Sequence, residues 1–247
     1  MKEDDKAGKD FWEMAWQRTP FEIYTGIEKY LAINQKFDKL FKQFLEKGNK
    51  KILEIGCAKA KRLIYFAKEF GYEVYGIDYS KHGVEIALDN LKIAGVDGTI
   101  LCEDLFQTTF DDESFDIVYS MGLVEHFENP AEIIDKHIKL LKKGGILIIT
   151  IPNFKYSLYF SLLKILGKEK KLLETHNLDV MDTKKLNELL QNGNIKILAL
   201  DYFGPIDLTL IFSDIKIKMV YLMHILNQFV GYSTFFIPKS RYLSPYI

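Results

Sequence analysis

A strand, a turn of small residues, a helix and a second strand that ends in an acid follow one another between residues 51 and 78. The first strand runs into the small residues of positions 56–60, and Asp78 follows Gly56 by twenty-two positions. In an open α/β sheet, nucleotide-like ligands bind outside the carboxyl ends of the strands, and an acid about 20 residues after the turn accepts the ribose hydroxyls. The segment therefore predicts a binding site for an adenosine-type molecule.

The spacing of the small residues argues against a dinucleotide. A pyrophosphate-binding turn has the pattern Gly-x-Gly-x-x-Gly, but counting from Gly56 places Ala58 at the second glycine and Lys61 at the third. A lysine is too large for the close packing of helix and strand that the third glycine permits. The alternative spacing Glu-x-Gly-x-Gly-x-Gly fits Glu54, Gly56, Ala58 and Ala60, with alanine at two glycine positions. Alanine stays small but adopts positive φ less readily.

Composition limits the class of protein. The 247 residues suffice for one large α/β domain, and a net charge of −1 gives no basic surface for nucleic acid. The two cysteines, Cys57 and Cys102, lack metal-ligand spacing, which favours a reduced cytoplasmic chain. Residues 1–6 are polar and contain no signal-peptide core, and the apolar stretch 206–230 is interrupted by charges, so we expect no transmembrane span.

Strands and helices alternate through the middle of the chain. Helices are expected over about 61–70, from the N-cap Ser80 to Gly95, and from Asn129-Pro130 to the glycines at 144 and 145. This alternation predicts an α/β fold with a doubly wound, mostly parallel Rossmann-like sheet and helices on both faces. The expected strands lie at about 51–55, 73–77, 99–102, 115–120, 146–151 and 195–202.

The flanking segments are read as additions to this core. Helical patterns near residues 11–16 and 26–46 predict an N-terminal helical lid over residues 1–48. The core spans residues 49–204, with an acceptor-side insertion at about 154–181 and helices near 156–166 and 182–190. Residues 205–247 are expected to add an aromatic insertion and a last strand to the same domain.

Four segments in the core, in the right order, resemble the class I S-adenosylmethionine (SAM)-dependent methyltransferases, particularly those that act on small molecules. They are the turn at 54–60, the strand end at 77–80, residues 102–105 and the strand and turn at 115–127. The resemblance covers residues 50–153 well and implies a seven-stranded sheet whose last strand is antiparallel. Residues 241–247 approach that strand and then stop.

The resemblance also implies roles for individual residues. The turn after the first strand would cradle the methionine part of SAM, Asp78 would accept from the ribose, and Asp104 would accept from the adenine amino group. Glu103 could replace Asp104, and Glu54 could serve only to hold the turn. The SAM-binding residues implied in this way are Glu54, Gly56, Cys57, Ala58, Asp78, Tyr79, Asp104, Leu105, Ser120, Met121 and Arg18.

His126 and His176 are the candidates for catalysis. His126 lies in the Glu-His pair that opens toward the methyl acceptor in the resembling enzymes, and the ordinary pKa of histidine suits proton removal at neutral pH. His176 lies in the later region that supplies the acceptor pocket in that family. Either histidine could instead be structural. One histidine per segment does not demand a metal, and we predict no metal site.

These observations together predict methyl transfer from SAM to a small-molecule acceptor, on an oxygen of a sugar or other secondary metabolite. An N- or C-methyltransferase on the same fold is the alternative, and a non-catalytic SAM-binding or assembly protein is an alternative of another class. A nicotinamide oxidoreductase is disfavoured by Lys61. The aromatic insertions after residue 153 suggest either a bulky or lipid-linked acceptor or a homodimer interface.

Overall fold

The computed structural model describes residues 5–18, 32–156, 158–191 and 195–203. The chain divides into two compact units, one of Met1–Thr25 with Glu46–Thr150 and one of Gly26–Leu45 with Ile151–Ile247. The predicted boundaries at residues 48 and 204 do not coincide with these limits, and residues 1–48 contribute to both units. The division into lid, core and C-terminal insertion therefore stays a prediction, and residues 205–247 lie outside the described part.

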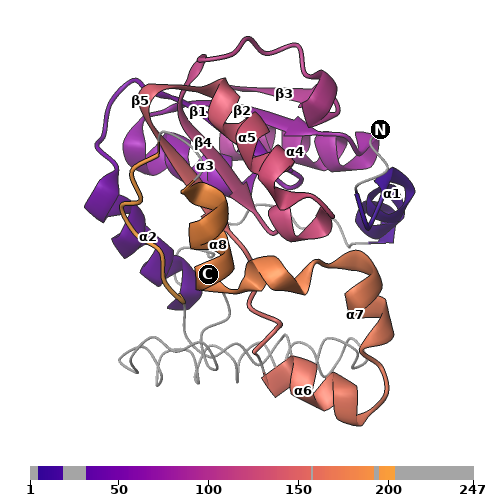
Figure 1. Cartoon of the computed structure of the whole chain (residues 1–247). Helices are drawn as coiled ribbons and strands as arrows, with labels where there is room; N and C mark the ends of the chain where they lie inside the picture. Colours follow the sequence, from indigo (N-terminus) through magenta and orange to yellow (C-terminus); the bar gives the residue numbers. More distant parts are fainter. Residues whose placement is uncertain (1–4, 19–31, 157, 192–194, 204–247) are drawn as a thin grey trace. The chain divides into compact units, whose positions relative to one another are not determined.

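The first unit is built on one parallel sheet of five described strands (Figure 1). The strand order is β3-β2-β1-β4-β5, so the chain starts in the middle of the sheet and winds outward in both directions. This arrangement confirms the predicted doubly wound parallel sheet. The strands are β1 (Lys51–Ile55), β2 (Glu73–Asp78), β3 (Gly98–Cys102), β4 (Phe115–Met121) and β5 (Leu141–Thr150).

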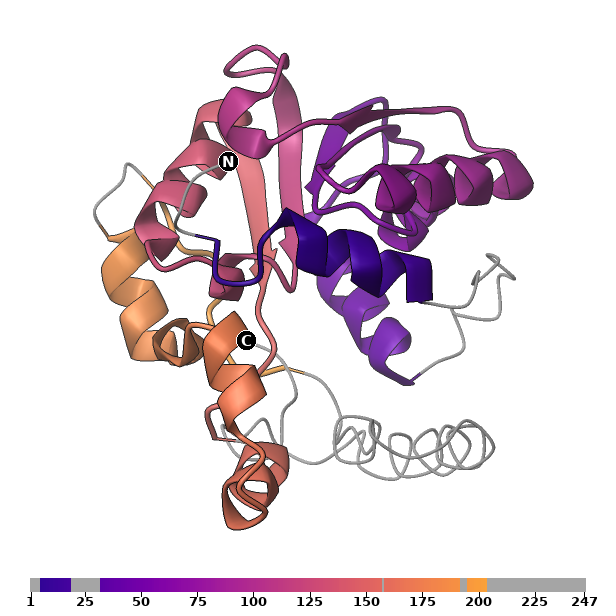
Figure 2. The same ribbon diagram turned by 90° about the vertical axis from the view of Figure 1, so that its right-hand side faces the viewer.

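Helices cover both faces of this sheet. Figure 2 shows α3 (Lys61–Phe70) and α4 (Lys81–Ala94) on one face and α5 (Pro130–Leu140) on the other, as right-handed crossovers require. Local signals fix the ends: the Ser80 hydroxyl accepts from the Gly83 N–H at 3.0 Å, and Gly95 closes α4 at φ 64°. The remaining short elements of this unit are α1 (Lys9–Arg18), η2 (Leu105–Gln107) and η3 (Val124–His126).

The start of β5 corrects one prediction. The sequence predicts a helix up to the glycines at 144 and 145, but α5 ends at Leu140 and β5 begins at Leu141. Phe115 on β4 pairs with Leu141, and Lys142 Nζ lies 3.0 Å from both carboxylate oxygens of Asp116 on β4. The pairing shifts register between Phe115 and Ile117, and Gly144 adopts φ 77°. The glycines thus belong to a strand irregularity and do not cap a helix.

The second unit contains α2 (Ala32–Phe44), α6 (Leu158–Ile165), α7 (Lys170–Thr175), η4 (Leu178–Met181) and α8 (Thr183–Leu190). Helices at about 156–166 and 182–190 were expected from the sequence, and α6 and α8 confirm them. Asp182 caps α8 by accepting from the Lys184 N–H at 2.8 Å. Residues 195–202, which the structure describes, form no strand, so the predicted sixth strand is wrong there. The predicted last strand at 241–247 lies outside the described residues.

Within the described residues, no helix combines the length and the apolar character that crossing a bilayer requires.

Candidate active site

The carboxyl ends of β1, β2 and β4 lie side by side in the first unit. Ile55 at the end of β1 pairs with Ile77 on β2 and with Ser120 on β4. The loops that leave these three strands therefore start from neighbouring positions. This edge is where an open α/β sheet binds its ligand.

The turn after β1 keeps its shape despite its alanines. Gly56 has φ 74°, and its N–H donates to the Ile77 carbonyl at 2.8 Å, which joins the turn to β2. Ala60 also adopts a left-handed conformation, at φ 50°, and so takes the backbone geometry that a glycine would take freely. An L-residue in this conformation costs roughly 1–2 kcal/mol. Alanine at position 60 therefore carries a conformational cost that glycine would not carry.

Asp78 ends β2 with its carboxylate buried and turned toward the first loop. Its Oδ2 accepts from the Ala58 N–H at 3.1 Å, and its Oδ1 accepts from the Ser80 N–H at 2.9 Å. Burial raises the pKa of Asp78 to about 6, and these two hydrogen bonds oppose that rise. Asp78 thus holds the loop after β1 against the start of α4. A carboxylate oxygen can accept more than one hydrogen bond, so both oxygens can also accept from a ligand.

Two further oxygens near this edge are buried and have no hydrogen-bond partner among the described residues. They are Oε2 of Glu54, on β1, and Oγ of Ser120, on β4. Burial raises the pKa of Glu54 to about 8, with the Arg62 charge opposing the rise and the Asp78 charge adding to it. Buried polar atoms are nearly always paired in native proteins, so such atoms indicate that a polar ligand completes the site. The buried oxygens of Glu54, Asp78 and Ser120 together fit an amino-acid-bearing nucleoside such as SAM.

The residues predicted to flank the adenine lie at the ends of β2 and β3. The Tyr79 hydroxyl donates to Asp5 Oδ2 at 2.6 Å, and burial together with that carboxylate raises the pKa of Tyr79 well above its usual range. Asp104 caps η2 by accepting from the Phe106 N–H at 3.0 Å, and Leu105 is buried. The alternative acid, Glu103, is engaged by Thr108 and Thr109. Both acids thus accept hydrogen bonds within the chain, and the assignment of Asp104 to the adenine stays a prediction.

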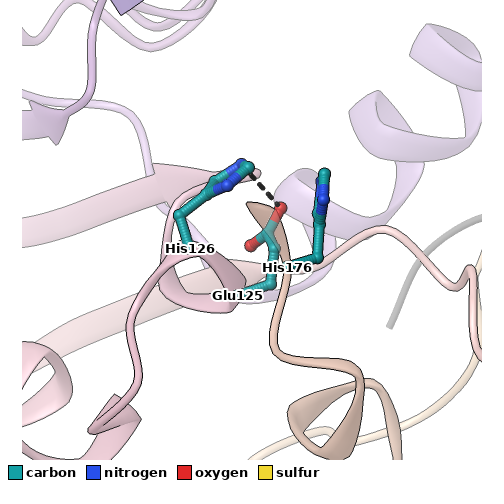
Figure 3. A group of neighbouring side chains, drawn as sticks. All are labelled: Glu125, His126 and His176. Carbon is teal, nitrogen blue, oxygen red and sulfur yellow. Dashed lines mark ion pairs between the residues drawn. The ribbon is translucent and has the colours of Figure 1, made fainter. Parts of the chain in front are cut away.

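Glu125 and His126 follow β4 in the short turn η3, and both are buried (Figure 3). Glu125 Oε1 lies 3.8 Å from His126 Nε2, and Glu125 Oε2 has no partner among the described residues. Burial raises the pKa of Glu125 to about 8, against a hydrogen bond from its own backbone. A carboxyl group that is largely protonated at neutral pH thus lies beside an imidazole. The imidazole of such a pair can accept a proton.

The N-terminal helix α1 contacts this same edge, which the sequence did not predict in detail. Glu13 accepts from the Ser80 hydroxyl at 2.6 Å, two residues after Asp78. The Trp12 ring meets the His126 ring edge-to-face with centroids 4.9 Å apart. Lys59, in the loop after β1, places its Nζ 5.5 Å from the centre of the Trp16 ring. Residues of α1 thus touch the loop after β1, the end of β2 and η3.

Two predicted residues cannot be placed in this edge. Arg18 ends α1, and its side chain is outside what the structure describes. His176 belongs to the second unit, where it follows α7 and its ring meets that of Phe154 with centroids 5.3 Å apart. The roles of both residues stay predictions. Glu13 and Asp5 are the contacting residues that sequence reasoning missed, and no motif marks either of them.

Comparison with known proteins identifies the family of the first unit. Residues 53–149 match a family model described as a methyltransferase domain. The ubiquinone biosynthesis O-methyltransferase of Coxiella burnetii is 28% identical over 162 residues, which is 65% of this chain and 64% of that protein. Phosphoethanolamine N-methyltransferase 2 of Caenorhabditis elegans is 34% identical over 126 residues, which is 50% of this chain and 28% of that protein. The chain therefore spans less than two thirds of the length of either relative.

A solved structure agrees on the fold. The chain resembles phosphoethanolamine N-methyltransferase 2 of Haemonchus contortus, in complex with S-adenosyl-L-methionine, with a TM-score of 0.52 and 22% identity. The match covers 64% of this chain and 36% of that one. The order of the motifs, the matched family model and the β3-β2-β1-β4-β5 sheet agree with one another. Residues 53–149 therefore form a methyltransferase domain with a Rossmann-like sheet, and the relatives support its assignment to the class I, SAM-dependent methyltransferases.

Proposed function

We propose that the protein binds SAM at the carboxyl edge of its sheet and transfers the methyl group to an oxygen of a small molecule. The observation that carries this proposal is the buried Asp78 carboxylate, which joins the loop after β1 to the start of α4. An acid at this position accepts from ribose hydroxyls in nucleotide-binding α/β folds. The family model that matches residues 53–149 supports the same reading.

The chain's own residues have distinct tasks in this proposal. The turn at 56–60 and Glu54, whose Oε2 is buried without a partner among the described residues, would hold the amino-acid part of the cofactor, and Asp78 would hold its ribose. The bound cofactor would supply a methyl group on a sulfonium sulfur. Once the methyl group is transferred, the rest of the cofactor leaves as a neutral thioether. Because the leaving group needs no proton, the protein contributes mainly alignment of the two reactants and exclusion of water.

An oxygen acceptor gives the pair in η3 a role. A hydroxyl group is a poor nucleophile until its proton is removed, so a base beside it speeds the reaction. In our proposal, His126 takes the hydroxyl proton as the new carbon–oxygen bond forms. The carboxylate form of Glu125, whose Oε1 lies 3.8 Å from His126 Nε2, would stabilise the imidazolium that results. Because burial favours the protonated form of Glu125 at neutral pH by raising its pKa to about 8, this stabilisation should grow as the pH rises toward 8. Methyl transfer to nitrogen is the second candidate, favoured by the local similarity to a phosphoethanolamine N-methyltransferase.

The pH dependence of SAM binding tests the cofactor part of the proposal. Burial raises the pKa of Asp78 to about 6 in the free protein, so the carboxylate is mostly charged at pH 7 and mostly protonated at pH 5. If binding requires the charged form, isothermal titration should give a Kd about tenfold weaker at pH 5 than at pH 7. NAD should give no binding heat at either pH.

The control for this titration is the variant Asp78→Asn, whose side chain does not titrate. Its Kd for SAM should be weak and nearly the same at the two pH values. An equal Kd for the wild-type protein at pH 5 and pH 7 would remove Asp78 from the site. Tight binding of NAD would argue for the oxidoreductase reading that Lys61 disfavours.

A further inference from the structure

The second unit contains a turn between α6 and α7 (Figure 1). Large apolar side chains at this turn are exposed. Ile165 is 81% exposed, the highest value among the large apolar residues of the described chain, and its neighbour Leu166 is 56% exposed. Leu173, on α7, is 44% exposed. Single exposed apolar residues are ordinary, whereas adjacent ones are a feature of surfaces that bind a partner or a membrane.

The backbone of this turn is well defined. The Gly167 N–H donates to the Lys164 carbonyl at 3.2 Å, and the Lys168 N–H donates to the Leu163 carbonyl at 2.9 Å. With Gly167 at φ 62°, these bonds form the Schellman ending of a helix. Leu163, just before this turn, is buried, whereas Ile165 and Leu166 are exposed. The exposed pair therefore lies at a helix end whose backbone is fixed by hydrogen bonds.

Basic residues surround the exposed pair. Residues 158–175 contain four lysines and two glutamates, which gives this stretch a net charge of +2 in a chain whose total is −1. Lys164 and Lys168 are exposed and flank Ile165 and Leu166 directly along the chain. Lys170 pairs with Glu174 at 3.6 Å and is also exposed. The surface thus combines an apolar tip with a positive rim.

We propose that the α6–α7 turn docks on an anionic lipid bilayer. The apolar pair would enter the boundary between headgroups and acyl chains, and the lysines would contact anionic headgroups. A second copy of the chain is a poorer occupant, because a symmetric contact would bring two positive rims together. The proposal concerns a surface contact only and is independent of the proposed methyl transfer.

Sedimentation of the full chain with lipid vesicles tests this surface. We expect binding to vesicles of mixed phosphatidylcholine and phosphatidylglycerol, weak binding to phosphatidylcholine alone, and loss of binding at high salt. The double variant Ile165→Ser with Leu166→Ser should reduce partitioning by about tenfold or more. Lys168→Gln should reduce it by about fivefold on the anionic vesicles only.

A matched control replaces exposed apolar residues elsewhere. Leu88 and Ile93, on α4, are 44% and 51% exposed, and the variant Leu88→Ser with Ile93→Ser should bind vesicles as the wild type does. Circular dichroism and Tm of both double variants establish that each is folded. The proposal is overturned if the wild type does not sediment with the anionic vesicles. It is equally overturned if the two double variants lose binding alike, or if the Ile165 and Leu166 variant changes only self-association.

Discussion

Asp78→Asn is expected to weaken SAM binding by roughly 100-fold or more. The substitution removes a charged acceptor, and hydrogen bonds to charged groups contribute about 1.5–3 kcal/mol each. Asp78 also accepts from Ala58 N–H and Ser80 N–H, so an amide here brings an N–H donor close to backbone donors. Loss of those contacts is offset in part by removal of a charge that burial disfavours, so the free variant should remain folded. Isothermal titration and a thermal shift with SAM measure the effect.

Asp116→Asn is the matched control for this variant. Asp116 also accepts from a backbone N–H, that of Lys51 at 2.8 Å, and from Lys142 Nζ, but it lies where β1 and β5 begin. Its replacement should lower the free energy of unfolding by about 1 kcal/mol and leave the SAM Kd unchanged. If both variants weakened SAM binding equally, the loss at Asp78 would reflect the sheet's stability and not contact with the cofactor.

His126→Ala is expected to lower kcat by roughly 100-fold or more while SAM binding changes little. A general base contributes about 10²–10⁴-fold when it removes a proton from the reacting hydroxyl. The measurement is formation of S-adenosylhomocysteine with a panel of hydroxyl-bearing small molecules as acceptors. A bell-shaped or sigmoid pH profile in the wild type should flatten in the variant, which a purely structural role would not cause.

Packing must be separated from proton transfer at this position, because the His126 ring contacts the Trp12 ring. His126→Gln keeps much of the volume but supplies no base, so its loss of kcat should match that of alanine. His82→Ala, on the partly exposed start of α4, is a histidine control that should retain wild-type kcat. Full activity in His126→Gln would assign His126 a structural role and favour the nitrogen-acceptor alternative.

The sheet and most of its helices could be predicted from the sequence because their signals are local. Ser80 caps α4 and Gly95 ends it, and each acts within a few residues of its own position. Short apolar runs between such caps are too short for helices, so they are predicted to be strands. Asp78 at the end of β2 and the turn after β1 are likewise marked by short motifs. The order of these motifs was therefore enough to predict which edge of the sheet binds the cofactor.

The errors occurred where distant residues decide the structure. The start of β5 pairs with β4, where Leu141 lies opposite Phe115 and Lys142 contacts Asp116, and these partners are 26 residues apart in the sequence. No local pattern encodes such contacts. The predicted strand at 195–202 has an apolar run but forms no strand in the described chain. A strand needs a partner with free backbone groups, and an apolar run alone does not supply one.

The contacts of α1 were out of reach for the same reason. The sequence predicted an amphipathic helix with two tryptophans but gave no indication that Glu13 accepts from Ser80. That contact joins residues 67 positions apart, and a single glutamate between tryptophans has no distinguishing pattern. Its consequence is functional, since α1 meets the end of β2 and η3 at the edge where we propose that SAM binds.

A structure from crystals of the protein grown with S-adenosylhomocysteine would test the proposed site most directly. We predict that both ribose hydroxyls lie within hydrogen-bonding distance of the Asp78 carboxylate and that the amino-acid group lies against the turn at 56–60. Density for the nucleoside at another place, or an edge of the sheet that stays filled by protein side chains, would contradict the account.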